Sequence, residues 1–361
     1  MKQAFYSVIV GTGSYIPKRS VPNEAFLTYD FFDANGSRID APVEKTVNKF
    51  KEITTIEERR YVEDDQTCSD IGYLAAEDAL QSSGIDRESL DYIIVAHNFG
   101  DLKSENPHVD IVPSIASRIK HKLRIENPYC VPYDLPFGCP GWVQGMIQAD
   151  YFIRSGDAKH ILVIGAETLS RVCDPHDRDS MIYADGAAAT LLQQQALAQP
   201  AGILSHITRS DTLDHAYMLW QGPSFKPDYP GNDQFIKMHG HRLYKYALQH
   251  VPEVVKKSIE KADLSITDID KVLIHQANGK MDAAILSNLL RLYGQHVDPE
   301  YLMPMTVSWL GNSSVATVPT LLDLMWKKQM NGHTFTPGSH IVFASVGAGM
   351  NINSIVYRFP E

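Results

Sequence analysis

The sequence predicts an α/β fold made from two similar halves, and two observations support that prediction. Apolar runs rich in β-branched residues alternate along the chain with segments whose apolar residues recur at helical spacing. The same alternation begins again in the second part of the 361-residue chain, which is long enough to bury two fused cores. We therefore assign an N-terminal half to residues 1–195 and a C-terminal half to residues 196–361.

The N-terminal half is predicted to alternate strands with helices. Three apolar runs have the composition of buried strands: "YIIVAHN" (92–98), "YCVPYDL" (129–135) and "HILVIGAE" (160–167). Helical spacing predicts one helix over residues 112–123 and another over "GWVQGMIQADYFIRSG" (141–156). Asn-Gly and Asp-Ala-Pro are turn signals, so we expect a loop or a small excursion over residues 26–50.

The C-terminal half repeats this rhythm. Helical patterns cover residues 241–264, 282–293 and 318–332, and Gly332 is expected to end the last of them. Three runs are predicted to be strands: "KVLIHQA" (271–277), "HIVFASVGAG" (340–349) and "INSIVYRF" (352–359).

Composition excludes several classes of protein. The formal net charge of −10 argues against a nucleic acid or an anionic membrane as the main partner. No stretch approaches the ~20 apolar residues that cross a bilayer, and the first apolar run is too short for a signal peptide, so we expect a cytoplasmic protein. The four cysteines are scattered and form no C-x-x-C pair, which argues against disulfides and zinc.

Cys139 lies between Gly138 and Pro140, at the point where a strand is expected to turn into a helix. If the helix begins at Cys139, the unpaired N–H groups and the positive end of the helix dipole lie beside the sulfur and favour the thiolate. Pro140 would then occupy the first helical position, where proline is tolerated. The alternative is that Cys139 is a small buried hydrophobic residue, as most free cysteines are.

A nucleophilic cysteine needs a base and an orienting group, which the sequence offers in two later segments. His275 in "VLIHQANGK" follows a buried run and would project from the carboxyl end of a sheet. Asn312 lies in the Gly-Asn-Ser-Ser turn of "VSWLGNSSVATVP". Taken singly, such a histidine is usually structural and such an asparagine is usually a turn residue or a helix cap.

Taken together, these segments resemble the β-ketoacyl-ACP synthase III family of the thiolase superfamily. The resemblance is carried by "HQAN" (275–278), "GNSS" (311–314) and "DGAAA" (185–189), and it runs from residue 10 nearly to the carboxyl terminus. It implies a thiolase-like, five-layered αβαβα fold, a homodimer, and a catalytic triad of Cys139, His275 and Asn312. It also implies that the backbone N–H groups of Cys139 and Ala348 form the oxyanion hole.

The activity implied by this resemblance is a decarboxylative Claisen condensation in fatty acid biosynthesis. An acyl-CoA or acyl-ACP primer would acylate Cys139, and malonyl-ACP would then lose CO2 and attack the acyl group. His275 and Asn312 would donate hydrogen bonds to the enolate oxygen that develops. The resemblance implies thioester substrates only, without a metal, nucleotide or flavin cofactor.

Further positions match family residues that bind the substrates. Arg178 matches a residue that contacts the adenine of coenzyme A, and Lys245 and Lys280 match basic positions used for the acidic acyl carrier protein. Val112 matches a residue that closes the partner's acyl pocket across the dimer interface. The cations of "RIKHKLR" (118–124) are further candidates for carrier contacts, or else belong to a solvated helix face.

The chain also departs from the family. At the remaining coenzyme A clamp, where the family places Trp, Arg and Gly, the matching residues are Lys49, Ile53 and Thr55. An acyl-ACP donor or a longer primer is therefore an alternative to a short acyl-CoA.

Other functions remain open at this stage. Within the same fold, the chain could be a specialised enzyme that joins fatty-acid-derived chains, of the dialkylresorcinol or polyketide type. A cysteine-dependent thioester hydrolase would also use Cys, His and Asn, and a non-catalytic carrier-binding role is a further alternative. "GTGSYIP" (11–17) is a weak dinucleotide-binding signal, because the third glycine is absent and Pro17 would stop the helix.

Overall fold

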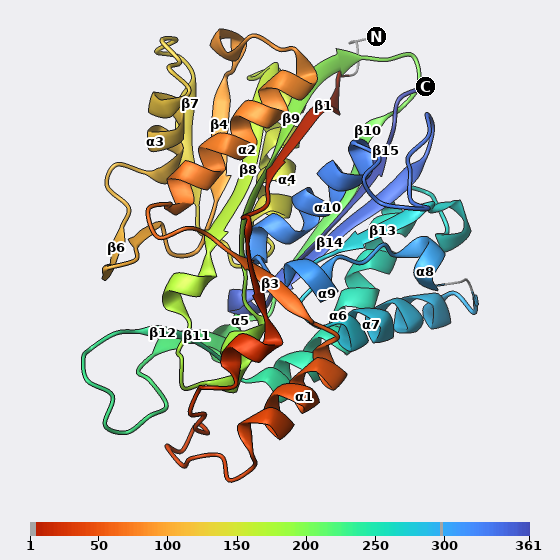
Figure 1. Ribbon diagram of the computed structural model, residues 1–361. Helices are drawn as coiled ribbons and strands as arrows, with labels where there is room; N and C mark the ends of the chain where they lie inside the picture. The colour runs from red at the N-terminus through yellow and green to blue at the C-terminus, as the bar shows by residue number, and fades with distance from the viewer. Residues whose placement is uncertain (1–4, 297–298) are drawn as a thin grey trace.

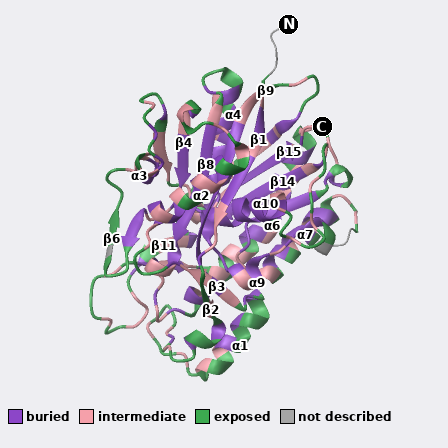
Figure 2. Cartoon of the chain, turned by 45° about the horizontal axis from the view of Figure 1, so that its top comes forward, coloured by how far each residue is buried: buried purple, intermediate pink, exposed green. Residues whose placement is uncertain are grey.

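The computed structural model describes residues 5–296 and 299–361, and the fold is α/β, as predicted. Two sheets are separated by a layer of helices and are covered on their outer faces by further helices, which gives five layers in the order αβαβα (Figure 1). Three of the four main apolar clusters fill the space between successive layers. The inner strands of both sheets are therefore buried on both faces, as Figure 2 shows.

The first sheet has five strands. Their order across the sheet is β1 (Phe5–Tyr15), β9 (Asp185–Ala196), β8 (His160–Thr168), β4 (Tyr92–Ala96) and β7 (Val131–Leu135). β9 pairs antiparallel with β1 and β8, whereas β8, β4 and β7 run parallel.

The second sheet repeats this pairing with four strands. Their order is β10 (Gly202–Ser210), β15 (Asn351–Arg358), β14 (His340–Gly347) and β13 (Lys271–Ile274). β15 pairs antiparallel with β10 and β14, and β14 runs parallel to β13. Each half of the chain thus supplies a sheet with the same succession of antiparallel and parallel neighbours.

Helices form the other three layers. The middle layer contains α4 (Gly141–Ser155) and α10 (Thr317–Trp326), which contact both sheets. The outer face of the first sheet carries α2 (Cys68–Ser83) and α3 (Ile115–Lys122), and that of the second carries α6 (Gly240–Lys261) and α7 (Gly279–Leu292). α4 follows a parallel strand and crosses back over the sheet, as a βα unit does.

Smaller elements extend from the loops. They comprise the paired strands β2 (Arg19–Pro22) and β3 (Glu58–Tyr61), β5 (Asp101–Lys103) and β6 (Asn106–Asp110), and β11 (Leu219–Gly222) and β12 (Phe235–Met238). The short helices are α1 (Val43–Thr54), α5 (Thr212–His215), α8 (Pro299–Leu302) and α9 (Val307–Leu310). No helix of the described residues is long and apolar enough to span a membrane.

Two local expectations need adjustment. Residues 26–50 were expected to form a loop or a small excursion, and the second part of this segment contains α1, because Val47, Phe50 and Thr54 recur at helical spacing and are buried. The helix expected to end at Gly332 ends at Trp326. The chain is buried as far as Met325 and becomes partly exposed beyond it, and Lys328 adopts a left-handed conformation with φ of 58°.

Candidate active site

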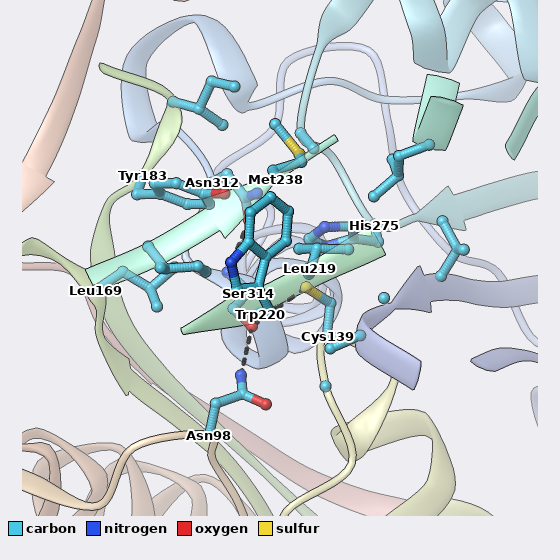
Figure 3. A pocket seen from close by; sticks show the side chains of 18 of the residues that line it. Asn98, Cys139, Leu169, Tyr183, Leu219, Trp220, Met238, His275, Asn312 and Ser314 are labelled. Carbon is cyan, nitrogen blue, oxygen red and sulfur yellow. Dashed lines mark hydrogen bonds between the residues drawn. The ribbon is translucent and has the colours of Figure 1, made fainter. Parts of the chain in front are cut away.

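One cavity of about 250 Å³ opens where strands of both sheets end, and it brings together Cys139, His275 and Asn312 (Figure 3). Cys139 follows β7, and His275 follows β13 directly. Asn312 enters from the segment between α9 and α10. The carboxyl ends of parallel strands are the usual location of ligand sites in α/β folds, so this meeting point is the candidate active site.

Cys139 lies in a tight elbow, although the helix begins later than the sequence suggested. α4 starts at Gly141 with Pro140 as its N-cap, which places Cys139 two residues before the helix. The pKa of the Cys139 thiol is raised to about 11, because burial outweighs the hydrogen bond from Ser314, while the nearby charge of Glu167 adds to the increase. The expectation that the helix end would favour the thiolate is therefore corrected: at rest Cys139 is a thiol.

Backbone from both halves meets at this elbow. Gly138 has φ of 69°, and a Cβ at this residue would lie 2.8 Å from the backbone N of Ala348. A Cβ on Gly347 would lie 2.6 Å from the backbone N of Cys139. Only glycines allow this approach. The residues expected to supply the two oxyanion-hole N–H groups, Cys139 and Ala348, therefore lie close together.

His275 is buried and is held at the strand end by the bond from its backbone N–H to the Ala344 carbonyl, at 2.8 Å. Burial lowers the pKa of its ring to about 4, and the backbone of Ser314 opposes part of this decrease. The imidazole is therefore neutral at physiological pH. In this form it can accept a proton at one nitrogen and donate a hydrogen bond from the other.

Asn312 is oriented by its own turn. Its backbone N–H donates to the Ile182 carbonyl at 3.0 Å, and its carbonyl accepts from the N–H of Ala184 at 2.8 Å. Its side-chain Oδ1 accepts a hydrogen bond from the backbone N–H of Ser314 at 2.8 Å. Because the oxygen is engaged in this way, the amide nitrogen is the end of the side chain that can act as a donor in the cavity.

Two neighbours of the sulfur were not identified as functional from the sequence. The Ser314 hydroxyl donates to Cys139 Sγ at 3.3 Å, and Asn98 Nδ2 donates to Ser314 Oγ at 3.0 Å (Figure 3). The available signals were weak: Asn98 follows a buried strand by two residues, and Ser314 ends the "GNSS" turn.

The rest of the cavity is mainly apolar, and a hairpin supplies much of its wall. Leu219 and Trp220 on β11 and Ile236 and Met238 on β12 line the cavity. The hairpin is fixed by a buried ion pair, in which Lys237 Nζ lies 2.5 Å from Asp174 and 3.3 Å from Asp177. This wall was not predicted from the sequence, because its strands are only four residues long.

The expected substrate-binding cations are exposed. Arg178, Lys245 and Lys280 lie close in sequence to Ile182, Leu243 and Met281, which line the cavity. Gly279, at the start of α7, packs against Thr55 at the end of α1, so Lys280 lies beside the helix that carries Lys49 and Ile53. None of the three cations is among the residues that line the cavity.

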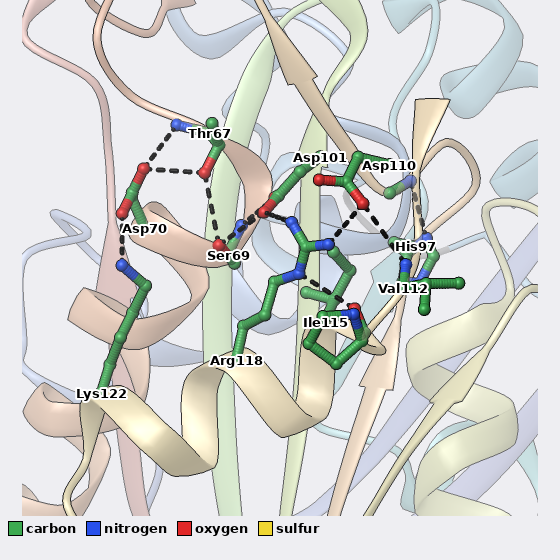
Figure 4. Close-up of polar contacts among 12 residues, drawn as sticks. Thr67, Ser69, Asp70, His97, Asp101, Asp110, Val112, Ile115, Arg118 and Lys122 are labelled. Atoms are coloured by element: carbon green, nitrogen blue, oxygen red, sulfur yellow. Dashed lines mark hydrogen bonds and ion pairs between the residues drawn. The ribbon is translucent and has the colours of Figure 1, made fainter. Parts of the chain in front are cut away.

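Most of the basic run at 118–124 is engaged within the chain (Figure 4). Arg118 pairs with Asp101 at 2.8 Å and with Asp110 at 2.5 Å, and Lys122 pairs with Asp70 at 2.7 Å. Lys120 donates to two backbone carbonyls. Three of the four Lys and Arg side chains in this basic run therefore have partners within the chain.

The Arg118 network also supports the segment that carries Val112. Asp110 accepts from the Val112 backbone N–H at 3.4 Å, and Arg118 Nε donates to the Pro113 carbonyl at 2.9 Å. Val112 itself is 83% exposed and does not line the cavity of its own chain. Among the described residues, no group of three or more His, Cys, Asp or Glu side chains could hold a metal ion.

Comparisons with known proteins identify the family of this chain. The family model for 3-oxoacyl-(acyl-carrier-protein) synthase III matches residues 133–212, and the model for its C-terminal part matches residues 259–359. The chain is 31% identical to β-ketoacyl-(acyl-carrier-protein) synthase III 1 of Vibrio parahaemolyticus, over 98% of this chain and 100% of that protein.

Solved structures of similar proteins have the same fold. The β-ketoacyl-(acyl carrier protein) synthase III of Thermus thermophilus superposes with a TM-score of 0.78 and 27% identity, over 98% of this chain and 99% of that one. A priming β-ketosynthase from a polyketide biosynthetic pathway shares the fold, with a TM-score of 0.80 and 24% identity over 100% and 98% of the two chains. The predicted resemblance is thus confirmed: the chain belongs to the 3-oxoacyl-(acyl-carrier-protein) synthase III family of condensing acyltransferases.

Proposed function

We propose that this condensing enzyme joins an acyl thioester primer to malonyl-ACP with loss of CO2, in fatty acid biosynthesis, through an acyl group on Cys139. The observation that carries the proposal is the convergence of Cys139, His275 and Asn312 in one mainly apolar cavity of a chain from this family. Thioester chemistry supplies both the electrophile and the leaving group, so the proposed reaction includes no metal or organic cofactor.

In the first half-reaction, Cys139 attacks the thioester carbonyl of the primer. The sulfur must lose its proton, and neutral His275 is the base in the cavity that can accept it. The tetrahedral oxyanion accepts hydrogen bonds from the N–H groups of Cys139 and Ala348, and each such donor contributes ~100-fold to 1,000-fold to the rate. The thiolate of the primer, from coenzyme A or from the carrier, then leaves and takes up the proton held by His275.

In the second half-reaction, malonyl-ACP loses CO2 and leaves an enolate. The amide nitrogen of Asn312 and an N–H of His275 donate to the enolate oxygen, where negative charge develops. The carbanion attacks the acyl carbonyl on Cys139, the thiolate of Cys139 leaves, and a β-ketoacyl-ACP is released.

The proposal is tested by intact-protein mass spectrometry after incubation with a panel of acyl-CoA and acyl-ACP donors. The native chain should retain the mass of one acyl group on the peptide that contains Cys139, and the Cys139→Ala variant should retain none. Cys130→Ala is the matched control, because Cys130 is buried away from the cavity. An acyl adduct that persists on Cys139→Ala would show that another residue is the nucleophile.

The roles of His275 and Asn312 should separate kinetically. Asn312→Ala should abolish malonyl decarboxylation while leaving most of the acylation of Cys139, because Asn312 acts only on the enolate. His275→Ala should slow both steps, since a thiol with a pKa of about 11 needs a base. Acylation and CO2 release are measured separately by rapid quench. Equal effects of the two substitutions on acylation would contradict this division.

We also propose that Lys245 and Lys280 bind the acidic carrier, with Arg178 contributing to the binding of the nucleotide or of the carrier. Two observations support this proposal. The three cations are exposed and lie close in sequence to residues that line the cavity, and the chain as a whole carries a negative net charge. A carrier arriving there would bring its thioester to the cavity.

Lys245→Glu and Lys280→Glu should therefore raise the KM for malonyl-ACP several-fold at low salt and flatten its salt dependence. The KM for a small malonyl thioester without the carrier should stay unchanged. Lys257→Glu, an exposed substitution further along α6, is the control. If malonyl-ACP keeps its KM in both variants, the carrier binds to another surface.

A homodimer is proposed on the basis of an open sheet edge. Within the described part of the chain β7 has a sheet partner on one side only, and large apolar side chains near it are exposed: Val109, Ile111, Val112, Tyr129 and Val131. β6 and β7 lie on the same side of the molecule in Figure 1. A second copy that paired along β7 would cover this surface, and Val112 would then reach the partner's acyl cavity.

Val112 should then limit the length of the primer. Each methylene that the cavity can bury is worth ~0.8 kcal/mol, or roughly a fourfold gain in affinity, so medium or long acyl donors should outcompete acetyl. Val112→Phe should shift the preference toward shorter donors, and light scattering should report a dimer for both proteins. A preference for acetyl in the native chain, or a longer-chain preference that Val112→Phe leaves unchanged, would contradict this assignment.

The second candidate function is a specialised condensation that joins fatty-acid-derived chains. The observation that favours it lies on α1, where Lys49 and the half-exposed Ile53 occupy positions expected to bind coenzyme A. The donor panel separates the candidates, because this enzyme would accept long acyl-ACP donors and reject acyl-CoA. A thioester hydrolase would instead release free acid without consuming malonyl-ACP.

A further inference from the structure

A chain of hydrogen bonds leads from the Cys139 sulfur away from the cavity and into the first sheet. The Ser314 hydroxyl donates to Cys139 Sγ at 3.3 Å, and Asn98 Nδ2 donates to Ser314 Oγ at 3.0 Å. The same Asn98 nitrogen also donates to the Glu167 carboxylate, whose other oxygen lies 3.4 Å from the Asn98 backbone nitrogen. Figure 3 shows how Asn98 and Ser314 lead to the sulfur.

The chemistry of these groups fixes the direction of the chain. In its ionised form Glu167 can only accept hydrogen bonds, so Asn98 presents its amide nitrogen to the carboxylate rather than its oxygen. That nitrogen can only donate, so the Ser314 oxygen accepts from it. The hydroxyl of Ser314 has a single hydrogen, which then remains available to point at the sulfur. Reversing Asn98 would bring its amide oxygen against the carboxylate.

Glu167 has no role in the proposed reaction, and its burial needs an explanation. It lies near the carboxyl end of β8, is 1% exposed and belongs to no ion pair among the described residues. Burial raises its pKa to about 7, while the charge of His97 and the bonds from Asn98 oppose this increase and the charge of Asp185 adds to it. Burying an unpaired carboxyl group costs folding free energy. Buried carboxyl groups with a shifted pKa cluster at functional sites.

We propose that Glu167 is a positioning residue that orients Asn98 and, through it, holds the Ser314 hydroxyl as a hydrogen-bond donor on the Cys139 sulfur. A donor at the sulfur stabilises the thiolate that must form before attack. The inference rests on the proposed role of Cys139 as nucleophile. It assigns to Glu167, Asn98 and Ser314 a part in activating the thiol that is separate from the roles of His275 and Asn312.

The charge of Glu167 acts in the opposite direction. As a nearby anion it raises the pKa of the Cys139 thiol, whereas through Asn98 and Ser314 it favours the thiolate. His275 and Tyr183 are the other titratable groups among the described residues that line the cavity with Cys139, and no substitution proposed below changes either of them. Glu167→Gln removes the charge and keeps an acceptor oxygen for Asn98, whereas Glu167→Ala removes both. The two variants therefore separate the charge from the hydrogen bonds.

The experiment measures the rate at which iodoacetamide alkylates Cys139 from neutral to alkaline pH, followed by peptide mapping and without any acyl donor. Ser314→Ala and Glu167→Ala should alkylate ~10-fold more slowly at neutral pH, which corresponds to an increase of about one unit in the pKa of the thiol. Glu167→Gln should alkylate at least as fast as the native chain. Thr168→Val, a nearly isosteric change at a buried neighbour on β8, should leave the rate unchanged.

A double variant tests whether the residues act as one unit. Ser314→Ala combined with Glu167→Ala should be no slower than Ser314→Ala alone, because both substitutions remove the same donor. If Glu167→Ala alkylates as fast as Glu167→Gln, Glu167 acts only through its charge and the proposal is overturned. If Glu167→Ala does not fold, Asn98→Leu replaces it: a rate reduced to that of Ser314→Ala supports the proposal, and a native rate overturns it.

This outcome can be distinguished from failure of the proposed function. Alkylation is measured without an acyl donor and follows the thiolate fraction of Cys139 across pH, so the positioning chain can stand or fall whether or not an acyl group is later found on Cys139. Conversely, loss of the acyl adduct in Cys139→Ala tests the nucleophile without reference to Glu167.

Discussion

The geometry of the candidate active site depends on one close contact between the backbones of the two halves of the chain. The turn at Gly138 and Cys139 meets the turn at Gly347 and Ala348, and neither glycine leaves room for a side chain there. Each turn ends a strand or follows one in its own sheet, so the contact requires both sheets to stop at the same place. The middle layer, with α4 and α10 packed against both sheets, holds the two turns in register.

Burial at this contact determines the chemistry. The mainly apolar cavity raises the pKa of the Cys139 thiol to about 11 and lowers that of His275 to about 4, so both groups are neutral at rest. A neutral thiol is protected from indiscriminate oxidation and alkylation, because the thiolate is the reactive form. A neutral imidazole can donate to an enolate while it still has a nitrogen free to accept a proton. In the proposed reaction, local donors rather than permanent charge would therefore stabilise the anions as they form.

The sequence predicted what depends on periodicity and on motifs. The α/β class follows from alternating strand and helix patterns, and His275 was placed correctly at the end of a strand because the run before it is short and wholly buried. It could not predict contacts between segments distant along the chain. Asn98 and Ser314 are 216 residues apart, and each has an ordinary local explanation as a loop or turn residue.

Element ends were predicted less well, for physical reasons. Pro140 is compatible with both the N-cap and the first helical position, so the sequence left the start of α4 uncertain by a residue or two. The β11–β12 hairpin depends on the buried pair of Lys237 with Asp174, and in a sequence a lysine normally indicates an exposed position. Such residues are recognisable only once their partners are known.

The proposed reaction couples decarboxylation of malonyl-ACP to carbon–carbon bond formation. The most direct measurement follows labelled CO2 and the acyl products together, using malonyl-ACP labelled in its free carboxyl group and the primer that best acylates the enzyme. If the chain catalyses the proposed condensation, one labelled CO2 should be released for each β-ketoacyl-ACP formed, and no free acid should accumulate from the primer. Consumption of the primer to free acid, without release of labelled CO2, would contradict it and would identify a thioester hydrolase.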